Sequence, residues 1–238
     1  LAAAGLKPIF AVYSSFLQRA YDQILHDVCI QNLPVVFAID RAGLVGSDGE
    51  THQGIFDISY LSSIPNMTIM APKNKWELSD MIKYAVNFAY DGLKEYRAPI
   101  SIGKCEWIYR ESGIALFALG SMVKTAVAVR DALKAEGYPC SIINARFAKP
   151  LDEDALRYIT EHHKVIVTME ENVISGGFGE HVTEFYNNEN CKDIRIVNIA
   201  IPDEYVEHGN VELLRKEVGL DADTIIARTI EAYQNVTE

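Results

Sequence analysis

Short apolar runs alternate with amphipathic helical segments along the chain, and this alternation limits the fold more than any other feature. In the first half, residues 8–12, 34–39 and 67–70 are apolar runs typical of buried strands, and helical patterns occupy 15–28 and 74–85. Strands separated by helices favour a parallel sheet, because a parallel pair needs a long crossover between its strands. We therefore predict an α/β fold of the doubly wound type.

The same pattern restarts after an irregular stretch of mixed charge between Gly92 and Gly113. The expected elements of the second half alternate again: strands at 114–119, 140–144, 165–169 and 194–199, and helices at 121–136, 152–162, 179–186 and 224–233. We therefore predict two domains, residues 1–107 and 108–238, each a doubly wound unit with a mainly parallel sheet.

Local signals indicate where several helices begin. Ser15 with Gln18, and Asn74 with Glu77, match the spacing of a capping box, in which a short polar side chain bonds the amide three residues on. Ser121 directly precedes a helical face and is expected to cap it.

Composition and charge exclude several classes of function. The 238 residues contain 22 Lys and Arg against 33 Asp and Glu, a net charge of −11, and no basic stripe, so nucleic acid is not an expected partner. No apolar stretch is long enough to cross a membrane, and no signal peptide precedes the first strand, so we expect a cytoplasmic protein. Cysteines and histidines lack the spacing of metal ligands, so we expect no metal site within the chain.

The first segment with candidate chemistry runs from Tyr13 to Arg19, where a strand ends and a helix begins. Ligands of open α/β sheets bind at this edge. Phe16 could stack on a flat ring, and Arg19 could hold an anion. The alternative is a capped helix with Phe16 in the core and Arg19 in solvent, and spacing alone favours it.

The second segment, residues 40–54, follows a buried strand and is rich in glycine. It carries Arg41, Asp48 and His52, a set that can bind a phosphate, hold a hydroxyl and move a proton. The alternative is an acidic surface loop, which would rarely combine these three side chains with four glycines.

The third segment is Glu170-Glu171-Asn172 followed by the glycine-rich run 176–179. A glycine-rich turn before a helix can receive an anion, but the run does not match the dinucleotide-binding or P-loop patterns. Glycines that allow a strand and a helix to pack tightly are the favoured interpretation.

Several motifs together resemble the 1-deoxy-D-xylulose-5-phosphate synthases, a transketolase-like family. They are Y-S-S-F-L-Q-R-A-Y-D-Q, D-R-A-G-L-V-G-S-D-G-E-T-H-Q-G-I-F-D, I-P-N-M-T-I-M-A-P, N-A-R-F-A-K-P-L-D, E-E-N with G-G-F-G, and I-P-D-E-Y-V-E-H-G. The resemblance implies condensation of pyruvate with glyceraldehyde 3-phosphate, loss of CO2, thiamine diphosphate and Mg2+ as cofactors, and a homodimer. It also implies a role in isoprenoid and thiamine biosynthesis.

The resemblance further implies roles for individual side chains. Phe16 would face the aminopyrimidine ring of the cofactor, with Arg19 near its reacting end. The residues implied to act on the substrates are His52 and Tyr13 as catalytic groups, and Arg41 and Asp48 as ligands of the acceptor aldehyde and its phosphate.

The sequence also departs from the family's pattern. The family's activating glutamate would precede Leu1, and the diphosphate-binding domain with its Mg2+ site is expected outside this chain. The family's R-Y-P-R-G strand has no counterpart, because Phe88 runs directly into Ala89. We therefore expect an incomplete first domain and no activity from this chain alone. Two other functions stay open: the β subunit of a thiamine-dependent 2-oxo-acid dehydrogenase, and a non-catalytic, dimerising remnant.

Overall fold

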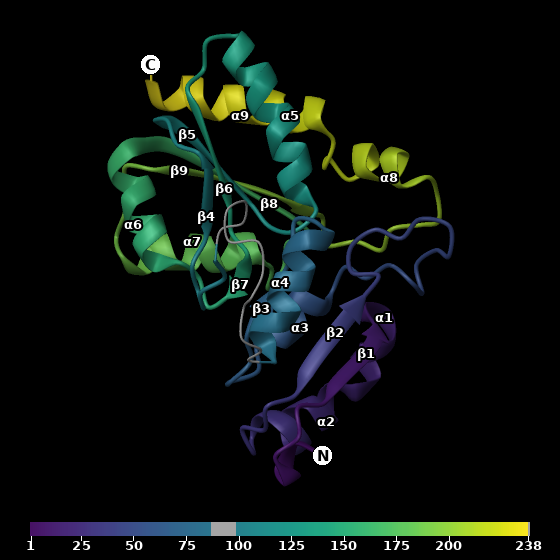
Figure 1. Ribbon diagram of the computed structural model, residues 1–238. Helices are drawn as coiled ribbons and strands as arrows, with labels where there is room; N and C mark the ends of the chain where they lie inside the picture. The colour runs from purple at the N-terminus through teal and green to yellow at the C-terminus, as the bar shows by residue number, and fades with distance from the viewer. Residues whose placement is uncertain (87–98, 238) are drawn as a thin grey trace.

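The computed structural model describes residues 1–86 and 99–237 and shows two connected α/β units (Figure 1). In the first unit, β1 (Ile9–Tyr13) and β2 (Val36–Asp40) pair in parallel. The helical elements of this unit are the 3-10 turns Ala2–Ala4 and Gln18–Ala20, α1 (Ser14–Leu17), α2 (Tyr21–Gln23), the π-helical segment Ile24–Cys29, α3 (Asp57–Ser62) and α4 (Lys75–Ala85).

The crossover between β1 and β2 is helical but irregular. It passes from α-helix through a 3-10 turn to a π-helical segment instead of forming the single helix expected at 15–28. Its inward face still matches the predicted apolar pattern, because Leu17 and Ile24 are buried against Leu61 and Ile64. Burial of these side chains, rather than helix regularity, holds the crossover against the strands.

The second unit contains a five-stranded sheet in the order β4-β6-β5-β8-β9. Its strands are β4 (Glu106–Tyr109), β5 (Gly113–Ala118), β6 (Cys140–Asn144), β8 (His163–Val173) and β9 (Arg195–Ile201). All neighbours are parallel except β4, an edge strand that the sequence did not predict and that runs antiparallel to β6.

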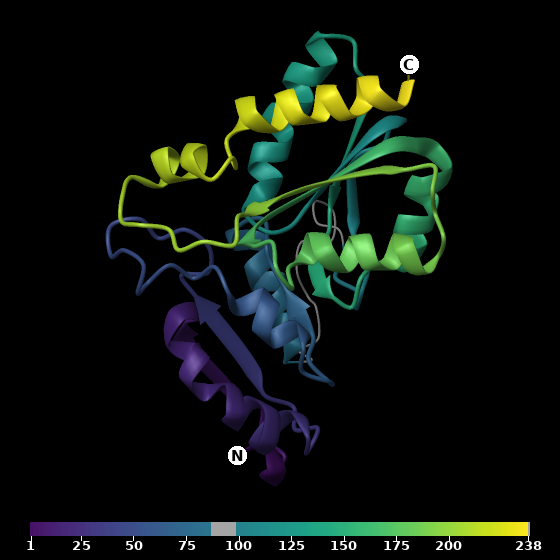
Figure 2. The same cartoon turned by 180° about the vertical axis from the view of Figure 1, so that it is seen from behind.

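Helices cover both faces of this sheet (Figure 2). They are α5 (Met122–Ala135), α6 (Glu153–His162), α7 (Phe178–Asn188) and α9 (Ala222–Thr237), whereas α8 (Val211–Glu217) lies to the side of the sheet (Figure 2). Leu116 on β5 packs in one buried cluster with residues of α5 and α9, whereas Phe117 packs in another with residues of α6 and α7. The side chains of β5 thus alternate between two buried faces, which confirms the doubly wound α/β class.

One predicted strand pairs differently from expectation. The apolar run at 67–70 forms the short strand β3 (Ile69–Met70), which pairs antiparallel with β7 (Phe147–Lys149) of the second unit instead of joining β1 and β2. Periodicity predicts that a strand exists but carries no information about its partner. The strand itself was therefore predicted correctly, and only its partner was wrong. The division at 107/108 stays a prediction, and the junction of Phe88 and Ala89 lies outside the described residues.

The predicted caps have mixed outcomes. The Asn74 side chain accepts from the amides of Trp76 and Glu77, as predicted. Ser121 makes no cap bond, because its hydroxyl donates to Glu171 at 2.6 Å. The Ser15 hydroxyl is buried and has no hydrogen-bond partner among the described residues. The capping box predicted for Ser15 and Gln18 is therefore wrong. No described helix is long and apolar enough to cross a bilayer.

Candidate functional site

The two segments that carry the candidate site residues leave the same edge of the first sheet. Tyr13 and Asp40 are register partners at the ends of β1 and β2. The chain then turns into α1 on one side and into the loop 41–56 on the other. Because β1 and β2 are parallel, their carboxyl ends bring Tyr13, Phe16 and the loop together.

Five of the six predicted side chains form one contact cluster. The Arg41 guanidinium lies 4.4 Å from the centroid of the Tyr13 ring, and its Nη1 is 3.1 Å from Asp48 Oδ2. The Tyr13 and Phe16 rings stack at 5.5 Å, and the Phe16 and His52 rings meet edge to face at the same distance. The cluster therefore combines a cation, a carboxylate, an imidazole and two aromatic rings.

The ion pair in this cluster is exposed and exchangeable. The side chains of Arg41 and Asp48 are 43% and 46% exposed, so water screens their attraction to about 1 kcal/mol or less. A phosphate could compete for Arg41 at small cost, because guanidinium groups bind phosphate oxygens in pairs.

His52 presents one ring nitrogen to the protein. Its Nδ1 lies 2.9 Å from the Thr51 hydroxyl, whereas Nε2 has no protein partner among the described residues. A hydrogen bond to one ring nitrogen orients the imidazole and leaves the other available for proton transfer.

Phe16 and Arg19 are both exposed, but only Phe16 contacts the other described residues of the cluster. Phe16 is 49% exposed, so its assignment to the core is wrong, and its ring is available to a flat ligand. Arg19 is also exposed, but it makes no hydrogen bond or ion pair with the cluster among the residues described. The structure thus brings together every predicted site residue except Arg19.

The backbone at Arg41 is held in an unusual conformation. Its φ of 55° lies in the left-handed region, which residues other than glycine rarely adopt. Gly43 and Gly54 exchange both backbone hydrogen bonds across the neck of the loop, and a Cβ on Gly54 would clash with the Arg41 carbonyl oxygen. Strain that a tight neck maintains is typical of binding loops.

Asp57 is a buried carboxyl that sequence reasoning missed, although it ends the loop motif. It is 5% exposed at the start of α3 and bonds the Ser14 hydroxyl and the Ile58 amide. Burial raises the pKa of this carboxyl from 3.8 to about 6, and the hydrogen bonds oppose the rise. Asp57 thereby ties the end of the loop to the residue that follows Tyr13.

The raised pKa of Asp57 predicts a pH-dependent stability. Between pH 3.8 and about 6 the folded protein binds this proton more tightly than the unfolded chain, so its contribution falls as pH rises through that window. Relative to Asp57→Asn, which does not titrate there, the wild type should lose up to about 3 kcal/mol of unfolding free energy. Urea unfolding of both proteins at pH 4, 5 and 7 measures the difference; a constant difference would contradict it.

The glycine-rich turn before α7 already holds a carboxyl group of its own chain. The amides of Phe178 and Gly179 donate to the two oxygens of the Glu170 side chain at 2.8 and 2.7 Å. Burial nevertheless raises the pKa of Glu170 to about 8. A Cβ on Gly179 would lie 2.6 Å from Thr168 Oγ1, so this glycine allows the tight packing that the sequence favoured.

The described residues fit only part of a thiamine diphosphate cofactor. The half-exposed Phe16 ring beside Tyr13 suits the flat pyrimidine ring. A diphosphate with a hard cation needs a cluster of oxygen ligands, and no group of three or more His, Cys, Asp or Glu that could hold a metal occurs among the described residues.

Comparison with known proteins defines the class. Residues 1–92 match the pyrimidine-binding domain of transketolase, and residues 103–225 match the transketolase C-terminal domain. The chain therefore belongs to the transketolase family. Its likeness to 1-deoxy-D-xylulose-5-phosphate synthases is confirmed by relatives of that name, 53% identical in Lachnoclostridium phytofermentans and 50% in Clostridium acetobutylicum.

Coverage limits what these relatives show. The alignments include 95% and 97% of this chain but only 38% and 39% of the relatives, so the chain spans about two fifths of their length. Two solved structures share the fold: a split-gene transketolase described as an inactive beta4 tetramer (TM-score 0.85, 22% identity, 98% of this chain and 78% of that one) and the transketolase of Leishmania mexicana (0.74, 16%, 98% and 35%).

Proposed function

We propose that this chain forms the pyrimidine-binding and C-terminal part of a 1-deoxy-D-xylulose-5-phosphate synthase, which condenses pyruvate with glyceraldehyde 3-phosphate and releases CO2. The contact cluster of Tyr13, Phe16, Arg41, Asp48 and His52 at one sheet edge carries this proposal. Thiamine diphosphate supplies the electron sink for decarboxylation when bound. We propose that its diphosphate and Mg2+ bind outside these 238 residues, and that the enzyme is a cytoplasmic homodimer.

The chain's own side chains divide the work on the acceptor. Arg41 releases Asp48 and binds the phosphate in its place. Asp48 then accepts a hydrogen bond from a hydroxyl of the aldehyde. His52 gives a proton from Nε2 to the aldehyde oxygen as charge develops there. The Tyr13 ring packs against the Arg41 guanidinium and keeps it in place. The exposed Phe16 ring stacks on the pyrimidine ring of the cofactor. Arg19, being exposed, would act on an anion brought by another domain.

A self-associating subunit without catalysis is the second candidate. Exposed apolar side chains on and around β1 favour it, with Ile9 and Phe10 each 50% exposed and Leu6 55% exposed. Patches of this kind mark interfaces between proteins. An activity assay separates the two proposals.

The test supplies the proposed diphosphate-binding domain from a relative. The 238-residue chain is assayed alone and mixed with the part of the Lachnoclostridium phytofermentans synthase that precedes its match to this chain, so that the activating glutamate implied by the resemblance is included, with pyruvate, thiamine diphosphate and Mg2+. We expect CO2 release only in the mixture and only with glyceraldehyde 3-phosphate present. Release without the aldehyde favours the 2-oxo-acid dehydrogenase alternative, and association without release favours the non-catalytic subunit.

Arg41→Ala should weaken the acceptor selectively. Loss of charge-assisted hydrogen bonds worth about 1.5–3 kcal/mol corresponds to a rise of about 10- to 100-fold in the KM for glyceraldehyde 3-phosphate. The KM for pyruvate should not change. Steady-state kinetics of the mixture measure both constants, with the exposed Arg228→Ala on α9 as control. An unchanged acceptor KM would remove Arg41 from the phosphate site.

A further inference from the structure

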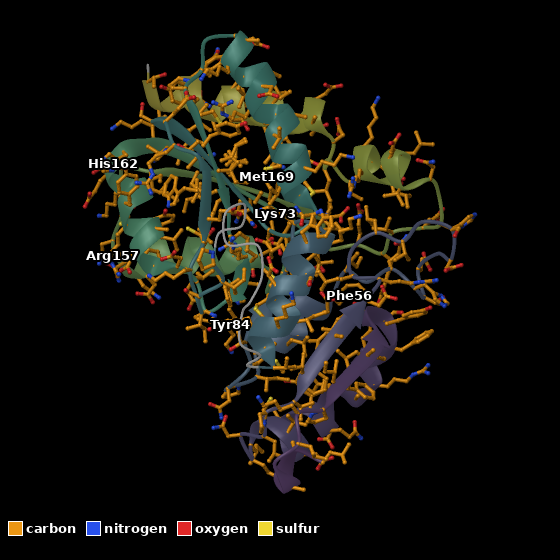
Figure 3. All side chains as sticks on the ribbon, viewed as in Figure 1. Phe56, Lys73, Tyr84, Arg157, His162 and Met169 are labelled. Carbon is orange, nitrogen blue, oxygen red and sulfur yellow. The ribbon has the colours of Figure 1, made fainter. Side chains whose placement is uncertain are left out.

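The loop 41–56 is embedded in the second unit through its apolar side chains. Leu44 and Ile55 are 8% and 1% exposed and belong to the same buried cluster as Val206 and Leu214 of the second unit. Phe56, labelled in Figure 3, packs against this cluster and meets Tyr205 edge to face at 6.1 Å. The loop is therefore part of the second unit's core, although it follows a strand of the first.

One connection of the second unit contacts the loop directly. This β9–α8 connection, residues 202–210, runs beside the loop in both views (Figures 1 and 2). The Gly209 amide donates to the Gly46 carbonyl at 3.1 Å, and a Cβ on Gly46 would lie 2.8 Å from the Gly209 carbonyl oxygen. The two backbones touch, so the connection fixes the path of the loop.

Gln53 joins the loop to this connection. Its side chain is 1% exposed, its Oε1 accepts from the Val45 amide at 2.8 Å, and its Nε2 donates to the Glu207 carbonyl at 3.1 Å. The amides of His52 and Gln53 both donate to the Gly49 carbonyl, so the two residues share one tight turn. His52 and Gln53 are adjacent in this turn, so a shift of Gln53 also shifts His52.

We propose that Gln53 is a positioning residue, through which the β9–α8 connection holds His52 and Asp48 in place for the acceptor. The inference rests on the proposed function and extends it: the second unit shapes the acceptor site without touching the substrate. Gln53 suits this task because an amide both donates and accepts, and both of its bonds, to the Val45 amide and the Glu207 carbonyl, are partly buried.

The test uses Gln53→Glu, which keeps the size and the acceptor but loses the donor to Glu207. Above the pKa of the new carboxyl, a carboxylate oxygen at position 53 would face the Glu207 carbonyl oxygen. Loss of this buried hydrogen bond should shift the equilibrium between the closed and open loop by about tenfold or more. We expect amide hydrogens of residues 43–54 and 207–210 to exchange at least about tenfold faster than in the wild type. Exchange in β5 and β6 should not change.

Protonation of the new carboxyl in Gln53→Glu should restore the lost hydrogen bond within the same variant. At pH 5 the carboxyl introduced by Gln53→Glu can donate again, so the exchange ratio of variant to wild type should return toward one. Other ionisable groups, including His52 on the same turn and Glu207 and His208 on the facing segment, are common to both proteins, so the ratio isolates position 53. Gln53→Leu should show the faster exchange at both pH values, and Glu207→Gln, which keeps the backbone carbonyl, should match the wild type.

Ligand binding separates this proposal from the proposed function. The full chain is titrated with glyceraldehyde 3-phosphate while the His52 ring is followed by NMR. We expect the wild type to respond, and Gln53→Glu to need at least about tenfold more ligand at pH 7.5. Equal exchange rates and equal ligand response in the two proteins would overturn the positioning role. Absence of response in the wild type, with faster loop exchange in the variant, would instead count against the proposed function.

Discussion

Replacement of His52 by alanine should slow turnover of the assembled enzyme by about 10²- to 10⁴-fold, the usual contribution of a group that transfers a proton. The loss should fall on kcat, because His52 meets Phe16 and Thr51 but forms no ion pair that would anchor a phosphate among the described residues. Single-turnover and steady-state rates of the reconstituted mixture measure it.

The control for this experiment is a second histidine. His162 lies on α6, far from the loop in Figure 3, where it stacks on Tyr158 at 3.9 Å. His162→Ala should leave kcat unchanged. If His52→Ala retains most of the rate, another group supplies the proton, and Tyr13 would be the next to test.

Replacement of Arg146 by leucine should cost about 3–5 kcal/mol of unfolding free energy, since it removes the nearer of the two cations from a buried carboxylate and leaves only Lys73 at 3.7 Å. Arg146 and Glu77 are 4% and 5% exposed, and Nε lies 2.8 Å from Glu77 Oε1. The guanidinium also donates to the Pro99 carbonyl. These bonds join α4 of the first unit to the residue before β7 of the second, so their loss should weaken both units.

Urea unfolding of the full chain measures this cost, with an exposed ion pair for comparison. Arg157 is 46% exposed and pairs with Glu153 and Glu189, so water screens both pairs and Arg157→Leu should cost far less than Arg146→Leu. Similar costs for the two variants would mean that the Arg146 pair is solvated in solution. The N-A-R-F-A-K-P-L-D motif then would need an explanation other than a buried ion pair.

Local patterns were sufficient for the fold class and for the position of the candidate site. The alternation of apolar runs and helical faces identified the two α/β units, and Asn74 marked the start of α4. Tyr13 and Arg41 each follow a predicted strand, and parallel strands end at one edge, so the sequence pattern alone was enough to predict their proximity.

Side chains that act across the two units could not be assigned in this way. Gln53 and Asp57 stand in the motif beside His52, but their burial and their partners at Glu207 and Ser14 depend on residues distant in the chain. Ser121 resembles a cap in sequence yet donates to Glu171. A local pattern fixes which group is present, whereas its partner depends on what the fold brings within hydrogen-bond distance.

The sequence by itself thus determined the α/β alternation and which polar and aromatic side chains stand at the strand ends, because both depend on short-range periodicity and residue type. Only the tertiary structure decided that β3 pairs with β7, that Arg146 neutralises Glu77, and that the loop is built into the core of the second unit. These are contacts between segments far apart along the chain, and their free energy comes from burial and pairing that exist only after the two units have packed.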